Sequence, residues 1–191
     1  LQMTRAGIAN GQSTPAGLTD EATAMPAGVG GPDIDEVNAA LGDEAFEFIA
    51  IPYSDTTSIQ AWVLVMSDES GRWSYVKQIW GHVYSCERNT FAQLVTNGKA
   101  RNYQHITVVG IEPGVPSTAW DFLAAYAARQ AVYISADPAR PTQTGNMLGI
   151  SPAKASERFS IEERNSLLKY GVATSVYAGG YQTIERAITT Y

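Results

Sequence analysis

The sequence is poor in the side chains that carry metal and thiol chemistry. Its 191 residues include one cysteine, Cys86, and two histidines, His82 and His105. A single cysteine excludes an intramolecular disulfide and is typical of a reducing compartment. Two histidines exclude a histidine-rich metal site, and acidic pairs such as Asp20-Glu21 lack the spacing of a calcium-binding loop. We therefore expect no cofactor and no metal ion.

Positive charge is also scarce. The chain has 13 Lys and Arg residues without a basic run, a net charge of −6 and a pI near 4.9. Phosphate binding needs a concentrated basic surface, so we expect no nucleic-acid partner. There is no apolar run of membrane-spanning length, and the N-terminus lacks a signal pattern, so we expect no membrane association. The chain starts at Leu1 without an initiator methionine, which suggests a piece of a longer protein.

The sequence shows no arrangement typical of a reaction centre. Cys86 and His82 lie four residues apart on an expected strand, which separates them by about 13 Å. The glycines of residues 28–31 lack the preceding strand of a dinucleotide fingerprint, and there is no P-loop Lys-Ser/Thr pair. We therefore predict no catalytic and no cofactor-binding residue.

The composition indicates a folded chain, with 45% hydrophobic and 17% charged residues. Residues 1–32 are rich in Gly, Ala, Thr and Pro and lack aromatic side chains, which predicts an extended lead-in. Residues 33–191 then form a single α/β domain. Helix-type and strand-type patterns alternate along it. We predict helices over 33–41, 56–68, 90–95 and 118–135, and strands over 46–51, within 75–84 and over 105–111.

The patterns continue to the C-terminus. Residues 137–152 contain four helix-breaking residues and predict a long loop. Ser160 and Glu163 have the spacing of a capping box and predict a helix that stops at Gly171. The tripeptide over 178–180 predicts a hairpin turn with Tyr177 and Tyr181 paired across it. The fold class is α/β, a sheet of mixed, largely parallel strands with flanking helices and a C-terminal β-hairpin.

Charged residues of the last third are candidates for contacts with a partner. Pro138 and Pro141 restrict the backbone around Asp137 and Arg140, so Arg140 could bind a carboxylate across an interface. Equally, Asp137 could cap the turn and Arg140 lie in solvent. Further candidates gather near the next helix and in the closing segment: Arg158, Glu163, Arg164 and Arg186.

An ordered set of short segments resembles the tail sheath protein of Mu-like contractile-tailed bacteriophages. They are Gly31-Pro32-Asp33-Ile34, residues 40–44, Ile51-Pro52-Tyr53-Ser54-Asp55, Gly81-His82, Arg101-Asn102, residues 137–144, Glu163-Arg164-Asn165 with Leu167-Leu168, and residues 184–191. No single segment is specific, but their order over residues 30–191 is.

The resemblance implies a structural subunit that polymerises around a tail tube and contracts to drive it through the host envelope. The implied partners are other copies of the full-length sheath protein, and the tail tube protein and baseplate through regions missing here. The implied location is the virion, and the host cytoplasm during assembly. The chain itself would be the central, outward-facing part and monomeric, with its six candidate residues as inter-subunit contacts. The alternative is a hydrolase-like α/β enzyme with an unidentified active site, for which a cleft with converging carboxylates would be the evidence.

Overall fold

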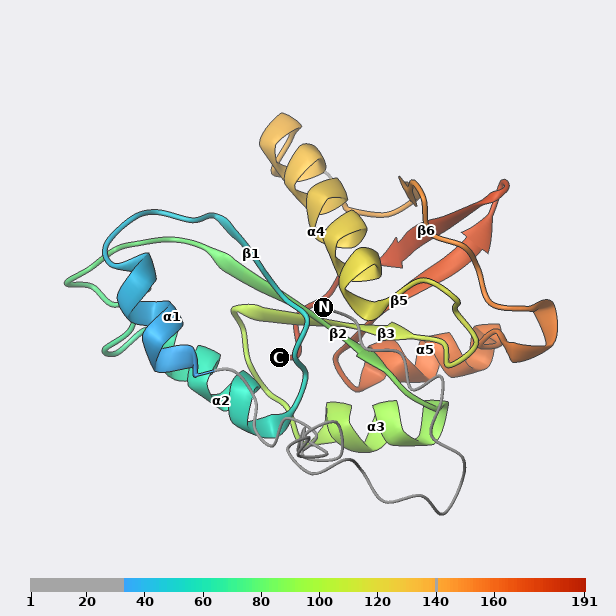
Figure 1. The fold of residues 1–191 in the computed structure, drawn as a ribbon, viewed down its shortest axis with the longest axis horizontal. Coiled ribbons are helices and arrows are strands. Elements are labelled where there is room, and N and C mark those ends of the chain that lie inside the picture. Colours follow the sequence, from blue (N-terminus) through green and yellow to red (C-terminus); the bar gives the residue numbers. More distant parts are fainter. Residues whose placement is uncertain (1–32, 140) are drawn as a thin grey trace, which may run out of the picture. The chain divides into compact units, whose positions relative to one another are not determined.

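The computed structural model describes residues 33–139 and 141–191, so the predicted lead-in and Arg140 lie outside the described residues. The described chain builds one six-stranded sheet with helices on both faces (Figure 1). Its strands are β1 (Phe48–Ile51), β2 (His82–Arg88), β3 (Ile106–Ile111), β4 (Gly145–Met147), β5 (Val172–Ala178) and β6 (Tyr181–Arg186). Its helices are α1 (Ile34–Leu41), α2 (Thr56–Val65), α3 (Phe91–Lys99), α4 (Ala119–Ala136) and α5 (Ile161–Lys169), with a short 3-10 turn over Ala155–Glu157.

The strand order is β1-β2-β3-β5-β6-β4. Strands β1, β2, β3 and β5 are parallel, because helical crossovers join each of them to the next. Strand β6 pairs antiparallel with β5, and β4 pairs antiparallel with β6. The predicted fold class is confirmed. The predicted hairpin is confirmed as well: Gly179 and Gly180 both have positive φ values, +60° and +89°, as the tight two-residue turn requires.

Strand β3 lies at the centre of the core. All six of its residues are buried, as its continuous apolar sequence predicts. Val109 and Ile111 belong to a cluster with α4, and Ile106 and Val108 belong to a second cluster with α2. Helix α4 therefore covers one face of the sheet and α2 the other, while α3 and α5 pack with β5.

The starts of four helices follow from their capping residues. The side chains of Asp33, Asp55, Thr118 and Ser160 each accept a hydrogen bond from a backbone N–H in the first turn. These bonds satisfy donors that the helix itself leaves unpaired. The capping box that the sequence predicts at Ser160 is confirmed.

Three element predictions were wrong in place or extent. The strand expected within 75–84 starts later, at His82, because residues 72–79 form turns stabilised by local hydrogen bonds. Helix α3 continues through Asn97-Gly98 to Lys99. A Cβ at position 98 would lie 2.5 Å from the Tyr170 carbonyl oxygen, so this glycine permits close packing and does not end the helix. The expected loop over 137–152 contains β4, which pairs with β6.

Two side-chain predictions also need correction. The helical spacing of Trp120 and Ala124 with Leu123 and Ala127 predicts one buried stripe on α4. Trp120 and Ala124 are instead exposed, and Phe122 and Tyr126 are buried in their place. Tyr177 pairs across the hairpin with Gln182, and Tyr181 pairs with Ala178. The two-residue turn shifts the register by one residue from the predicted tyrosine pair. No helix within residues 33–139 and 141–191 is long and apolar enough to cross a membrane.

Candidate interaction surfaces

Two of the predicted contact residues, Arg158 and Arg164, are held by their own domain. Arg164 Nε lies 2.8 Å from a Glu185 carboxylate oxygen, and its Nη1 donates to the Phe159 carbonyl over 2.6 Å. Arg158 Nε donates to the Ala153 carbonyl over 2.8 Å. The Arg158 guanidinium also lies 4.5 Å from the centre of the Tyr177 ring, a cation–π distance. These arginines fasten the 153–164 segment to the hairpin.

The two arginines lie near a buried carboxylate that sequence reasoning missed. Glu112 directly follows β3 and accepts a hydrogen bond from Phe159 N over 3.1 Å. Burial raises the pKa of Glu112, while the Phe159 hydrogen bond and the charges of Arg158 and Arg164 act in the opposite direction. The only signal in the sequence was an acidic residue at the carboxyl end of a fully apolar strand, where side chains from neighbouring loops converge.

Glu163 acts in the fold of its own helix. Its side chain accepts a hydrogen bond from Ser160 N over 2.7 Å, while Ser160 Oγ accepts from Glu163 N over 3.2 Å. This is the reciprocal capping box that the sequence predicts. Glu163 is half-buried, and one of its carboxylate oxygens is occupied by this bond.

Asp137 and Arg186 are the predicted contact residues whose side chains are exposed. Asp137 follows α4, and its carboxylate accepts a hydrogen bond from Ala139 N over 3.1 Å, as the turn-capping interpretation expects. Arg186 Nη1 donates to Gln143 Oε1 over 2.9 Å and leaves other donors for solvent or a neighbour. Arg140, the most specific of the six predictions, lies outside the described residues.

A recess on the α4 face is where an active site would be expected. It is an open cavity of about 780 Å³ whose lining includes the aromatic side chains of Phe48, Trp73, Trp80 and Tyr84. Glu47 is the one carboxylate among its lining residues, so no second carboxylate converges there. His82 and Thr107 also line the cavity, and His82 Nε2 lies 2.8 Å from Thr107 Oγ1.

The pKa values of His82 and Cys86 on β2 disfavour acid–base and nucleophilic chemistry at neutral pH. Burial, together with the charge of His105, lowers the pKa of His82 to about 4. Burial raises the pKa of the Cys86 thiol to about 12, and its Sγ lies 3.3 Å from the Ala119 carbonyl oxygen. The thiol therefore stays protonated and inert. The described residues contain no group of three or more His, Cys, Asp or Glu side chains placed to hold a metal ion.

Comparisons with known proteins place this chain among phage tail proteins. The family model described as "Phage tail sheath protein central domain" matches residues 27–190. The Mu-like prophage FluMu tail sheath protein of Haemophilus influenzae is 35% identical over 188 residues, which cover 98% of this chain and 38% of that protein. The crystal structure of a sheath tail protein from Desulfitobacterium hafniense matches with a TM-score of 0.59 and 15% identity, over 82% of this chain and 34% of that one. The last likeness shows the fold; the first two show the family.

Proposed function

Because the chain belongs to the phage tail sheath family, we propose that it is a structural subunit of a contractile tail sheath and forms the central domain of that subunit. The family is structural and not enzymatic, and nothing in the aromatic recess favours the hydrolase alternative. The chain spans 38% of the length of its curated relative. The activity of the whole subunit is therefore part of the proposal.

The observation that carries the proposal is the family match over residues 27–190, which spans every element of the described fold. Sheath subunits assemble with other copies of themselves around a tube. In the proposed assembly, many copies surround the tail tube, contact the baseplate, and release interface energy on contraction. The subunits assemble in the host cytoplasm and then reside in the tail of the virion.

Two side-chain contacts within the domain are consistent with its moving as one rigid body. The Arg164–Glu185 ion pair joins α5 to β6, and the Arg158–Tyr177 contact joins the 153–164 segment to the hairpin. Neither pair needs a neighbouring subunit to be complete. We propose that Asp137 and Arg186, which are exposed, are the better candidates for contact with a neighbour, together with Arg140.

The test is electron microscopy of a sheath protein that carries these residues, with a short epitope inserted between Gly179 and Gly180. The glycine pair forms an exposed turn, so the insertion leaves the core untouched. Helical tubes decorated by antibody on their outer surface would support both the assembly and the outward position. Tubes that bind antibody only after dissociation would contradict the outward position, and a protein that forms no tubes would contradict the function.

A further inference from the structure

The loop between α2 and β2 presents apolar side chains to solvent in a fixed shape. We call residues 72–81 the tip loop. Its base is anchored by the buried Arg72, whose guanidinium donates to the carbonyls of Gly42, over 2.8 Å, and Glu44. Trp73 Nε1 donates to the Gly81 carbonyl over 2.8 Å and thereby closes the loop on itself. These hydrogen bonds hold the tip loop in a defined conformation.

Hydrogen bonds also order the outer part of the tip loop. Lys77 N and Gln78 N both donate to the Ser74 carbonyl, over 3.1 and 2.9 Å, and Ile79 N donates to the Arg72 carbonyl over 2.8 Å. Gln78 has a positive φ of +51°, and its side-chain amide donates to the Tyr75 carbonyl. Little conformational freedom remains to be lost when such a loop binds a partner.

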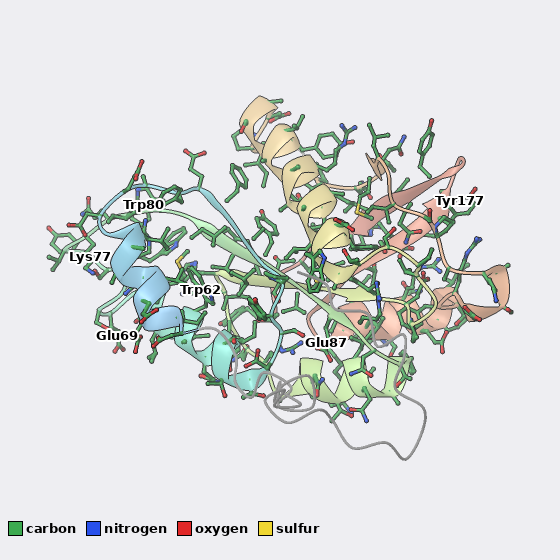
Figure 2. All side chains as sticks on the ribbon, in the orientation of Figure 1. Trp62, Glu69, Lys77, Trp80, Glu87 and Tyr177 are labelled. Atoms are coloured by element: carbon green, nitrogen blue, oxygen red, sulfur yellow. The ribbon has the colours of Figure 1, made fainter. Side chains whose placement is uncertain are left out.

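The tip of this ordered loop carries Tyr75 and Val76, which are 88% and 89% exposed, followed by the exposed Lys77. Figure 2 shows Lys77 at the outer end of the domain. Exposed apolar residues scattered singly are normal, whereas Tyr75 and Val76 are adjacent on one ordered projection, which makes them a candidate contact surface. Tyrosine is also among the residues that dominate binding energy at interfaces.

A recess with apolar and acidic lining residues, which complement the apolar and basic side chains of the tip loop, lies at the carboxyl ends of β2 and β3. It is an open cavity of about 810 Å³ beside the residues that follow β2 and β3. We call it the carboxyl-edge recess. Its apolar lining includes Phe91, Pro113 and Phe159, and its acidic lining consists of Glu157 and Glu163. Glu163 is engaged in the capping box, and Arg158, the one basic lining residue, is engaged with Ala153 and Tyr177. Glu157 is exposed, so its carboxylate is accessible to a partner.

We propose that the tip loop of one copy of this chain docks in the carboxyl-edge recess of a second copy. Tyr75 and Val76 would cover the apolar lining, and Lys77 would pair with Glu157. The two surfaces differ and lie at the two ends of β2, before His82 and after Arg88 (Figure 1). Such a head-to-tail contact repeats without closing on itself as a two-fold dimer does, which is how helical assemblies grow. The inference rests on the proposed sheath function, since that function supplies the many copies.

Disulfide trapping distinguishes this contact from its alternatives. A sheath protein that carries these residues is prepared with Val76→Cys, with Pro113→Cys, and with both changes. Cys86 is buried and does not compete for oxidation. Bridged cysteines need Cα atoms within about 7 Å, so the bond reports direct docking. The double variant should give a ladder of dimers, trimers and longer products, because each copy offers both halves. The single variants should stay monomeric when oxidised.

The outcomes separate the docking from the sheath function. Sheaths that form without a ladder in the double variant overturn the docking alone, and dimers of the Val76→Cys variant show a two-fold contact and also overturn it. A ladder without sheaths supports the docking and contradicts the sheath function. Absence of both overturns both.

Charge reversal gives an independent measure of the same pairing. Lys77→Glu and Glu157→Lys should each raise the concentration needed for assembly several-fold, as expected for an exposed ion pair, and the double reversal should restore most of the loss. A Tyr75→Ser, Val76→Ser variant should assemble poorly, while Leu148→Ser, at a residue 73% exposed in the turn after β4, should assemble normally. Thermal unfolding of each variant checks that the fold is intact. If the double reversal weakens assembly by the sum of the two single effects, the proposed pairing of Lys77 with Glu157 is contradicted.

Discussion

Arg101 and Glu87 form a buried ion pair, with 2.8 Å between the guanidinium Nη1 and the carboxylate Oε2. Their side chains are only 9% and 7% exposed. The other Glu87 oxygen accepts hydrogen bonds from the side-chain amides of Asn89 and Asn97, and Arg101 also donates to the Ser54 carbonyl over 2.9 Å. Figure 2 shows Glu87 between β2 and α3. This network joins the end of β2, helix α3 and the loop after β1.

Breaking this pair from one side should be costly. Arg101→Met leaves the Glu87 carboxylate buried without its cation, and we expect a loss of about 3–5 kcal/mol in the free energy of unfolding. The double change Glu87→Gln, Arg101→Met removes both charges and should be less destabilising than Arg101→Met alone. Urea unfolding of the wild type, Glu87→Gln, Arg101→Met and the double variant measures the coupling. A double variant whose loss of stability equals the sum of the two single losses would show that the two residues are not coupled.

Stability should depend on pH through His82. Its folded pKa, about 4, lies below the ordinary value of 6.5, so the folded protein disfavours the protonated ring. The stabilisation is complete above pH 6.5 and is lost as pH falls toward 4, by up to about 3 kcal/mol. A His82→Gln variant lacks this contribution, so its stability should decline less than that of the wild type between pH 7 and pH 4.5. Parallel declines in unfolding experiments would show that His82 titrates normally.

The capping box at the start of α5 gives a third prediction. Ser160→Ala removes the oxygen that accepts a hydrogen bond from Glu163 N, and we expect a loss of about 1 kcal/mol in stability. Ser160→Asp keeps an acceptor at the cap and should retain most of the stability. Thermal unfolding measures both. Unchanged stability in Ser160→Ala would show that the capping bond contributes nothing.

Gly98 should resist a substitution that normally stabilises a helix. Alanine in a helix interior is favoured over glycine by about 0.5–1 kcal/mol. At position 98, however, a Cβ would lie 2.5 Å from the Tyr170 carbonyl oxygen and 2.9 Å from Val172 Cγ2. We expect Gly98→Ala to destabilise the fold by about 1–3 kcal/mol, the usual range for overpacking. The sign of the change in thermal unfolding decides between the two effects.

The 191-residue chain should be a monomer, or at most a weak dimer, when studied alone. Exposed ion pairs such as those available to Asp137 and Arg186 contribute only about 0–1 kcal/mol each. The tip-loop contact is a single small projection, and small contacts hold polymers only when many are linked. Light scattering over a range of concentrations measures the mass. Tubes or rings formed by this chain would show that the determinants of assembly lie within its residues.

The sequence by itself determined the fold class, the helix starts, the buried central strand and the hairpin, because these depend on local rules. Asp33, Asp55, Thr118 and Ser160 cap helices through their immediate neighbours, and Gly179-Gly180 needs only its own backbone freedom. The ordered segments also carried the family resemblance, which the comparisons confirmed.

Only the tertiary structure decided which charged residues are free and where the surfaces lie. Nothing in the sequence distinguishes Arg158 and Arg164 from Arg186. In the structure, however, Arg158 contacts Tyr177 and Arg164 pairs with Glu185, both residues of the hairpin. Gly98 resembles a helix stop until Tyr170 is packed against it. Glu112 and Arg101 likewise depend on distant partners. Glu112 binds Phe159 and Arg101 binds Ser54, and in each pair the two residues are 47 positions apart in the sequence. Local patterns set the elements, but long-range packing sets the environment of each side chain, and that environment decides whether a residue fastens the domain or faces a neighbour.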